Sequence, residues 1–224
     1  LSMTSLGKRT NPPQGYYQPA EKRQRTNGQQ PEPLSPNIRK QAITQMDTYL
    51  ERFTNVKIPA NAYAEVELRL GIASSKGKFR SGVTKDFFDE YRNSLIARDN
   101  FTISHYDDTD YSIKTHPDFN RITINNDNEL NAMKKIPMWS PENISNRFRF
   151  DCRLSSAKEI SLDKSIAPTD IPDYWSTRRR KIRSEFSSPN YFWLIHLTEV
   201  TTIAKEGGVD STPSTTYEIE YELK

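Results

Sequence analysis

The chain has 224 residues, of which 34% are hydrophobic, and its mean hydropathy is −0.83. No apolar run approaches the roughly 20 residues that cross a bilayer, and no signal peptide opens the chain, so we expect neither membrane insertion nor secretion. The single cysteine, Cys152, excludes an internal disulfide and a cysteine-rich zinc site, and it fits a reducing compartment such as the cytosol or nucleus.

The formal charge of +3 lies within residues 1–35, and the rest of the chain is neutral, which argues against a general polyanion-binding surface. Residues 1–35 are rich in Pro, Gln, Gly and Asn and poor in aliphatic residues, so they cannot bury enough apolar surface to fold alone. We therefore expect a disordered or linker-like extension over residues 1–35 and one folded domain over residues 36–224. The EKRQR run in the extension is a weak match to a nuclear-import patch, and a solvated linker is the alternative.

Two segments have the apolar spacing of amphipathic helices. The first is SPNIRKQAITQMDTYLERF, with Ser35 as N-cap and Pro36 at the first helical position. The second is TKDFFDEYRNSLIARD, in which Phe87, Tyr91 and Leu95 share one face. We interpret both apolar stripes as packing surfaces.

The remaining pattern is typical of strands, because Thr, Ile, Tyr and Phe alternate with polar residues. Strands are predicted in AYAEVELRLGI, DFNRITINN, NRFRFDCRLSSAKEI, STRRRKIRSEF, NYFWLIHLTEV and TYEIEYELK. At least six strands with few helices predict an antiparallel, mainly β protein of the all-β or α+β class.

The charges on the polar strand faces are segregated by sign. The first and last strands carry the glutamates Glu65, Glu67, Glu218, Glu220 and Glu222, whereas the middle strands carry Arg121, Arg149, Arg153, Arg179, Lys181 and Arg183. A sandwich that shows its charges to water would explain each strand separately, but solvated faces usually mix the two signs. The segregation favours a closed barrel whose polar faces point inward.

If the first and last strands of this barrel pair, their carboxylates crowd together and raise one another's pKa unless a cation lies among them. An all-oxygen donor set suits Mg²⁺ or Mn²⁺ rather than zinc, and His105, His116 and His196 show no metal-ligand spacing. A metal on one wall and guanidinium and ammonium groups on the others predict a receptacle for a polyphosphate. The sequence has no Gly-rich P-loop, GxSxG, CxxC or HExxH motif, so side chains would hold the phosphates.

These motifs resemble a known family. ExExR at Glu65 to Arg69, KxR at Lys181 and Arg183, a following LT, and the terminal ExExE at Glu218 to Glu222 resemble the triphosphate tunnel metalloenzymes. More narrowly, residues 36–224 resemble the metal-dependent RNA 5′-triphosphatases that begin mRNA capping in fungi, protozoa and large DNA viruses, with the fungal form closest. The resemblance implies an α+β, mainly β fold: a closed eight-stranded antiparallel tunnel with a few flanking helices. It also implies Mg²⁺- or Mn²⁺-dependent removal of the γ-phosphate from 5′-triphosphate RNA, which leaves a diphosphate end for guanylyl transfer, with NTP hydrolysis as a side activity.

The resemblance assigns roles to individual residues. The metal ligands would be Glu65, Glu67 and Glu222, supported by Glu218 and Glu220. Glu159 would orient or activate the attacking water. The phosphate-binding residues would be Arg121, Arg153, Arg179, Lys181 and Arg183, with Lys134 or Lys135 as a further contact. The alternatives are an exposed basic edge strand for Lys181 and Arg183 and an ordinary loop carboxylate for Glu159.

The sequence departs from the family at two positions. His196 stands where the family usually has an aspartate, and Leu194 stands where an arginine often precedes it. An aspartate would hold basic side chains by ion pairs, whereas a histidine is neutral or positively charged. We therefore expect altered positioning of Lys181 and Arg183, with reduced activity or a changed pH profile.

The resemblance further implies partners: the mRNA guanylyltransferase, the transcription machinery, a second copy of the chain in a homodimer, and a nuclear location. Two other functions stay open at this point. One is a tunnel enzyme that acts on tripolyphosphate or thiamine triphosphate or cyclises ATP, and the other is a non-catalytic β module that binds phosphorylated or RNA ligands. RNA sequence preference is not expected, because contacts to phosphate carry no base information.

Overall fold

The structure is a computed structural model that describes residues 48, 51, 62–74, 77–114, 116–144, 150–162, 171 and 173–223. The predicted extension, the predicted boundary at residue 36 and most of the first predicted helix lie outside these residues, as do Arg147 and Arg149. Thr48 and Glu51, the described residues within that first helix, are both helical. Within the described part, no helix combines the length and apolarity needed to cross a lipid bilayer.

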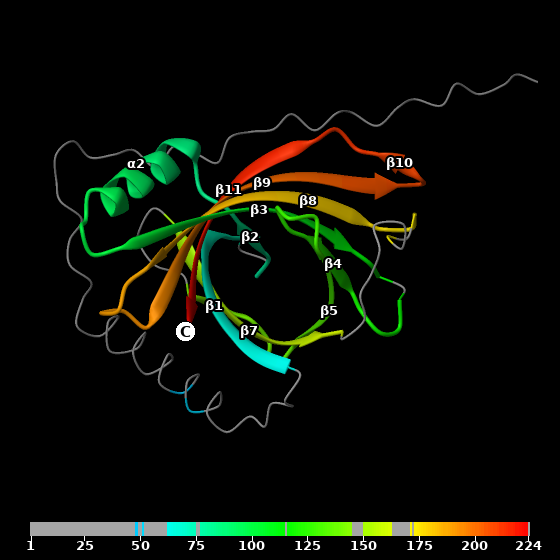
Figure 1. Cartoon of the computed structure of the whole chain (residues 1–224), viewed down its shortest axis with the longest axis horizontal. Helices are drawn as coiled ribbons and strands as arrows, with labels where there is room; N and C mark the ends of the chain where they lie inside the picture. The colour runs from blue at the N-terminus through cyan, green and yellow to red at the C-terminus, as the bar shows by residue number, and fades with distance from the viewer. Residues whose placement is uncertain are drawn as a thin grey trace, which may run out of the picture.

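Eight antiparallel strands form a closed ring, which Figure 1 views nearly end-on. In order around the ring they are β1 (Ala62–Ala73), β11 (Ser214–Leu223), β9 (Trp193–Glu206), β8 (Thr177–Ser187), β3 (Thr102–Ser112), β4 (Arg121–Ile124), β5 (Leu130–Pro137) and β7 (Asp151–Ser161), which pairs with β1 again. Three short strands extend the sheet: β2 (Phe79–Ser81) on β1, β6 (Glu142–Ile144) on β7 and β10 (Val209–Asp210) on β9. The eight-stranded antiparallel tunnel is confirmed.

The first and last described strands meet at the β1–β11 pair that closes the ring. Glu67 lies opposite Glu222, and Arg69 lies opposite Glu220. The predicted pairing of the first and last strands is therefore confirmed. Glu218 lies further along β11 and pairs with Thr198 of β9 rather than with the glutamates of β1.

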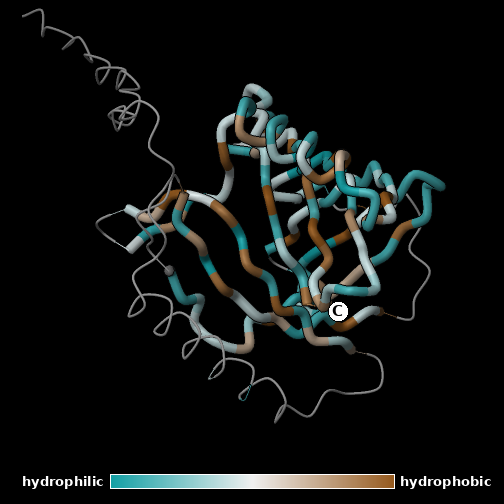
Figure 2. Tube along the Cα trace, turned by 90° about the vertical axis from the view of Figure 1, so that its left-hand side faces the viewer, coloured by the Kyte–Doolittle hydropathy of each residue, from teal (hydrophilic) through white to brown (hydrophobic). Residues whose placement is uncertain are grey.

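Alternation along the strands separates an apolar outer face from a charged inner face, and Figure 2 shows this alternation in hydropathy. On β1 the outward-facing Val66 is 1% exposed, and on β11 the outward-facing Ile219 is fully buried. Successive side chains of a strand point to opposite faces, so their neighbours Glu65, Glu67 and Glu220 point into the ring. This is the reverse of a sandwich that shows its charges to water.

Helix α2 (Lys85–Ile96) covers part of the outer face, as Figure 1 shows. Thr84 caps its N-terminus by accepting a hydrogen bond from the Phe87 N–H, so the predicted second helix is confirmed. Phe88 and Leu95 are buried from the helix side of the core, and four residues are buried from the strand side: Phe186, Ile195, Leu197 and Ile219. Full burial of each such side chain stabilises the fold by roughly 1.5–3 kcal/mol, which holds the wall rigid behind its charged inner face.

Two smaller apolar clusters cover other parts of the outer face. Val66 and Leu154 of β1 and β7 pack with Trp139 and Trp193. The other cluster is formed by Ile113, Phe119, Ile122 and Ala132, with Trp175 packed against it. The apolar side chains of the strands thus pack mainly on the outer face of the ring, and its interior is lined mostly by polar side chains.

Candidate active site

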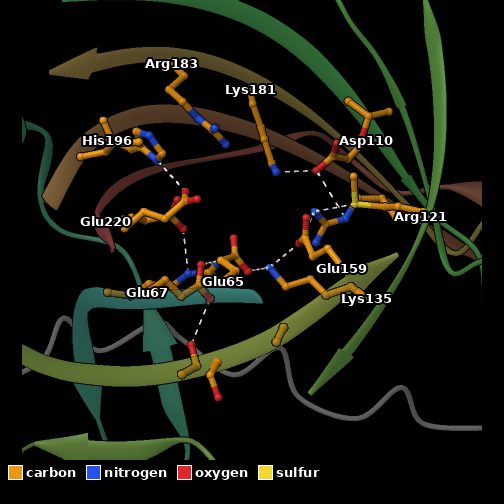
Figure 3. A pocket seen from close by; sticks show the side chains of 18 of the residues that line it. Glu65, Glu67, Asp110, Arg121, Lys135, Glu159, Lys181, Arg183, His196 and Glu220 are labelled. Carbon is orange, nitrogen blue, oxygen red and sulfur yellow. Dashed lines mark hydrogen bonds and ion pairs between the residues drawn. The ribbon is translucent and has the colours of Figure 1, made fainter. Parts of the chain in front are cut away.

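The interior of the ring holds a cavity of about 620 Å³ that is lined by side chains from all eight ring strands. Ligand pockets for small molecules usually fall between about 300 and 1,000 Å³, so a triphosphate fits. Figure 3 shows Lys181 and Arg183 reaching into the cavity from one side and Glu65 and Glu67 from the opposite side. The two signs predicted on different strands therefore face one another across a single space.

The acidic wall is organised by Arg69, which lies between two glutamates. Its Nη2 donates to Glu67 Oε2 at 2.8 Å, and its Nε lies 2.7 Å from Glu220 Oε1. Ser155 Oγ donates to the other oxygen of Glu67 at 3.0 Å. Burial would raise the pKa of Glu220, but the nearby Arg69, Arg183 and Lys181 outweigh it and hold that pKa at about 2. Glu220 is therefore ionised and fixed as a partner of arginine.

Glu65 and Glu222 lie in a different environment on the same wall. Burial, followed by the charges of Glu65 and other glutamates, raises the pKa of Glu222 to about 7. Burial and the charge of Glu67 also raise the pKa of Glu65, even though Lys135 forms an ion pair with it. The raised pKa values mean that the ionised forms of these two carboxylates are unfavourable in this environment. A bound cation would stabilise the ionised forms.

Lys181 and Arg121 of the basic wall share one aspartate. Asp110 is buried, forms ion pairs with Lys181 and, at 4.0 Å, with Arg121, and accepts a hydrogen bond from Thr123 at 2.7 Å. Burial raises the pKa of Asp110, but Lys181 and Arg121 outweigh it and lower that pKa to about 2. Burial also lowers the pKa of Lys181, and Asp110 partly offsets this change. Asp110 thus holds two basic side chains inside the cavity.

Two arginines of the cavity carry a buried N–H without an acceptor. The Nε atoms of Arg153 and Arg183 are buried and make no hydrogen bond to any residue of the described ranges. Arg153 lies with its guanidinium 4.9 Å from the ring centroid of Phe79. A buried donor without an acceptor destabilises the folded state. An anion inside the cavity could accept hydrogen bonds from these two groups.

Glu159 lies at the point where both signs meet. Its carboxylate is 4% exposed, lies 2.9 Å from Lys135 Nζ and 3.6 Å from Arg121 Nη1, and accepts a hydrogen bond from the Tyr63 hydroxyl. Burial raises the pKa of Glu159, but Lys135, Tyr63 and Arg121 together lower it below the usual range. An ionised carboxylate held by one hydrogen bond and two ion pairs can orient a water molecule by hydrogen bonding. It is a weak proton acceptor in this state.

His196 lies beside the acidic wall. Its Nε2 lies 3.1 Å from Glu185 Oε2, and its Nδ1 lies 3.5 Å from Glu222 Oε2. Burial and the positive charge of Arg183 lower its pKa. A neutral imidazole cannot form the ion pairs with Lys181 and Arg183 that an aspartate would form, and Asp110 instead pairs with Lys181.

As the side chains stand, no group of three or more His, Cys, Asp or Glu residues in the described ranges is arranged to hold a metal ion. The donor chemistry nevertheless fits a hard cation. Glu65, Glu67 and Glu222 are carboxylates that line one cavity from paired strands, and the pKa values of Glu65 and Glu222 are raised by burial and mutual repulsion. Binding would require Glu65 to exchange Lys135 for the cation.

The structure brings most of the predicted site residues together. The cavity is lined by Glu65, Glu67, Arg121, Lys135, Arg153, Glu159, Arg179, Lys181, Arg183, Glu220 and Glu222. Glu218 does not line it, and Arg179 Nη2 donates to this buried carboxylate at 2.8 Å. Of the two lysines left open by the sequence, Lys135 lines the cavity, whereas Lys134 points away and donates to the Pro117 carbonyl at 2.8 Å.

Several polar residues of the cavity were missed by the sequence analysis, among them Tyr63, Asp110 and Glu185. Tyr63 and Glu185 have the same parity as the predicted inward residues of their strands, so extending the alternation by two positions would have found them. Asp110 gave no such signal, because β3 was not predicted as a separate strand and carries acidic residues on both faces.

The fold of this chain is similar to that of several solved structures. Two structures of the S. pombe Pct1 RNA triphosphatase, alone and in complex with the Spt5 CTD, match with TM-scores of 0.61 and 0.59 at 18% identity, over 86% of this chain and 80% and 81% of theirs. The RNA triphosphatase domain of a trifunctional Mimivirus mRNA capping enzyme matches with a TM-score of 0.50 at 16% identity, over 82% of this chain and 88% of that one. No protein-family model and no curated protein matches the sequence. At this identity the likeness establishes the fold: the chain has the tunnel fold of RNA triphosphatases.

Proposed function

We propose that this protein is a metal-dependent RNA 5′-triphosphatase that removes the γ-phosphate of 5′-triphosphate RNA. The observation that carries the proposal is the buried Nε of Arg183, which lacks an acceptor among the described residues and lies in a cavity that also holds Glu65 and Glu222. Such a cavity offers an anion site and a cation site within one enclosed space. The tunnel fold shared with RNA triphosphatases supports the same reaction.

In the proposed reaction, the oxygen of a water molecule bonds to the γ-phosphorus, and the bond from that phosphorus to the β,γ-bridging oxygen breaks. The products are inorganic phosphate and a diphosphate-ended RNA, and the proton of the water passes to solvent at neutral pH. Charge neutralisation and positioning supply most of the rate in phosphoryl transfer. Arg183, Lys181, Arg121 and Arg153 would neutralise the phosphate oxygens, with Arg179 and Lys135 beside them.

Glu159 would hold the attacking water by accepting its hydrogen bond. The contacts of Glu159 with Lys135, Arg121 and Tyr63 fix its carboxylate in the cavity, which favours orientation of the water over removal of its proton. Tyr63 and Asp110 would act as positioning residues, the first for Glu159 and the second for Lys181 and Arg121.

Glu65, Glu67 and Glu222 would hold Mg²⁺ or Mn²⁺, and Glu220 and Glu218 would support them through Arg69 and Arg179. When bound, the cation neutralises charge on the phosphate that is attacked. With the glutamates unshielded, their charge would repel a triphosphate, so cation binding and substrate binding are expected to favour one another.

The proposed cellular role is the first step of mRNA cap formation in the nucleus. The diphosphate end would pass to an mRNA guanylyltransferase, and the chain would work as a homodimer close to the transcription machinery. One solved neighbour, S. pombe Pct1, is in complex with the Spt5 CTD, which supports a partner of that kind.

The test is release of labelled γ-phosphate from triphosphate-ended RNA with Mg²⁺ or Mn²⁺, for wild type, Arg183→Ala and Arg180→Ala. Arg180 is a matched control, because it lies on the same strand but points outward and pairs with Asp107 at 2.6 Å. We expect Arg183→Ala to lower kcat by about 100-fold or more and Arg180→Ala to leave it unchanged. Release from tripolyphosphate or thiamine triphosphate but not from RNA would reassign the substrate, and release from none of them would indicate a non-catalytic module.

A further inference from the structure

Two further cavities continue the central cavity to the outer surface. The first, of about 460 Å³, shares Arg121 and Lys135 with the central cavity, so it forms one mouth of the tunnel, which we call the Lys114 mouth. Its other lining residues are Ser112, Ile113, Lys114, Asn120, Ser176 and Thr177. The second, of about 520 Å³, shares Ser176 with this mouth. We call it the Trp175 groove, and it is lined by Asp173, Tyr174, Trp175, Ser176, Lys205 and Gly208.

We propose that the RNA chain behind the triphosphate leaves the tunnel through the Lys114 mouth and lies along the Trp175 groove. This inference rests on the proposed function and adds a binding site for the RNA body outside the tunnel. The occupant is a single-stranded polynucleotide, because the path begins at the cavity for the triphosphate, each further cavity shares lining residues with the one before it, and the last one is lined by Lys205, Tyr174 and Trp175.

The charges at the two ends of the tunnel decide the direction of the chain. Strands β3 and β8 run side by side, with Ser112 opposite Thr177 at one end and Ser104 opposite Glu185 at the other. The Lys114 mouth carries the cations Lys114, Arg121 and Lys135. Toward the other end, Glu185 and Glu222 line the cavity around His196. Arg121 and Lys135 already pair with carboxylates of the central cavity, so Lys114 is the cation that this mouth adds. The other end adds Glu185 and Glu222 beside Arg183. A phosphodiester chain carries one negative charge per nucleotide, so the first end is the more favourable exit.

The Trp175 groove has one lining cation, Lys205, held against an aromatic ring, and Arg178, which does not line the groove, contacts the same ring. Lys205 Nζ lies 4.9 Å and the Arg178 guanidinium 5.8 Å from the ring centroid of Trp175. Tyr111 packs edge-on against the same ring, with 6.0 Å between the two ring centroids, and this contact holds Trp175 against the barrel. Lys205 Nζ also donates to the Asp173 carbonyl at 2.7 Å. Both cations are therefore prepositioned on the outer surface, beside a single carboxylate lining the groove, that of Asp173.

Tyr174 supplies a surface on which a base can stack. Its side chain is 56% exposed and lines the groove next to Trp175. An exposed aromatic ring beside a basic track is the usual arrangement for binding single strands, because every base has a face that stacks and every linkage has a phosphate. The groove is thus expected to add affinity for RNA of any sequence and nothing for a free nucleoside triphosphate.

The test compares wild type with Tyr174→Ala and Lys205→Ala by fluorescence anisotropy. The probes are a 5′-triphosphate RNA of about 20 nucleotides and a 5′-triphosphate trinucleotide, both labelled at the 3′ end. We expect each variant to weaken binding of the long RNA by about fivefold or more and to leave the trinucleotide unchanged, and Lys205→Ala to reduce the salt dependence by about one phosphate contact. Arg180→Ala, which removes an exposed cation outside the groove, is the control and is expected to bind both probes normally.

Equal losses for both probes would overturn the inference, and so would unchanged binding of the long RNA. The readout is independent of turnover. If the wild type hydrolyses no triphosphate, the proposed function fails while the comparison of the two probes still decides where the RNA lies.

Discussion

Arg69 and Glu220 face one another across the β1–β11 pair that closes the barrel, with 2.7 Å between Nε and Oε1. The same arginine binds Glu67 on its own strand, so one guanidinium ties together the two acidic rows from opposite ends of the chain. Closure of the ring and assembly of the acidic wall therefore depend on the same side chain.

Replacing this arginine should weaken the fold. Arg69→Met leaves Glu67 and Glu220 buried without their partner, and breaking a buried ion pair costs about 3–5 kcal/mol. We expect urea unfolding to show a loss of about 3 kcal/mol in the free energy of unfolding. Arg180→Met, at an exposed ion pair on the outer face, should unfold like the wild type, and an equally stable Arg69→Met protein would contradict this role.

The adjacent lysines of β5 offer a comparison within one strand. Lys135→Ala removes the cation that lies between Glu65 and Glu159, whereas Lys134→Ala removes an outward-pointing cation that binds a backbone carbonyl. We expect kcat/KM for triphosphate-ended RNA to fall about 100-fold or more in the first variant and to change less than about twofold in the second. Comparable losses in both variants would show that the cavity does not determine the effect.

Asp110 should make the stability of the protein depend on pH. Its pKa is about 2 in the folded protein, below the ordinary value of 3.8, so its contribution is present above about pH 4 and is lost as the pH falls through 2. We expect Asp110→Asn to be less stable than the wild type by about 2 kcal/mol at pH 7. Urea unfolding from pH 7 down to pH 3 should show this difference shrinking toward acid, and a difference independent of pH would exclude the ion pair as its cause.

Glu222 should make metal binding depend on pH near neutrality. Because its pKa is raised to about 7, a proton competes with the cation below that pH. We expect the affinity for Mn²⁺ to rise by up to about tenfold per pH unit from pH 5.5 to 7 and to level off above it. In Glu222→Gln the affinity should be lower and its pH dependence smaller, as measured by isothermal titration calorimetry. The same pH dependence in both proteins would assign the competing proton to another group.

Alternation made the inner face of the tunnel predictable from the sequence. A strand reverses its side chains at every residue, so the spacing of Glu65 and Glu67 and of Lys181 and Arg183 already assigns each pair to one face. The segregation of sign then indicated that the faces meet inside a barrel. The same rule failed for Lys134 and Lys135, because two adjacent lysines satisfy either parity and only the register of β5 against β7 decides between them.

The pairing of the first and last strands was predicted, but its register was not predictable in the same way. Nothing in the local pattern of β11 places Glu222 opposite Glu67 or Glu220 opposite Arg69, since the choice depends on how the whole ring closes. Asp110 escaped prediction for a related reason. Its neighbour Asp107 faces outward and binds Arg180, and in a strand that is polar on both faces the composition does not identify the inner one.

The central claim is that one enclosed space binds a hard cation on its glutamate wall and a triphosphate on its basic wall. A crystal structure with Mn²⁺ and tripolyphosphate, refined against anomalous data, tests it most directly. The account predicts an anomalous peak among Glu65, Glu67 and Glu222 and phosphate density beside Lys181 and Arg183. Manganese and phosphate bound only outside the barrel would contradict it.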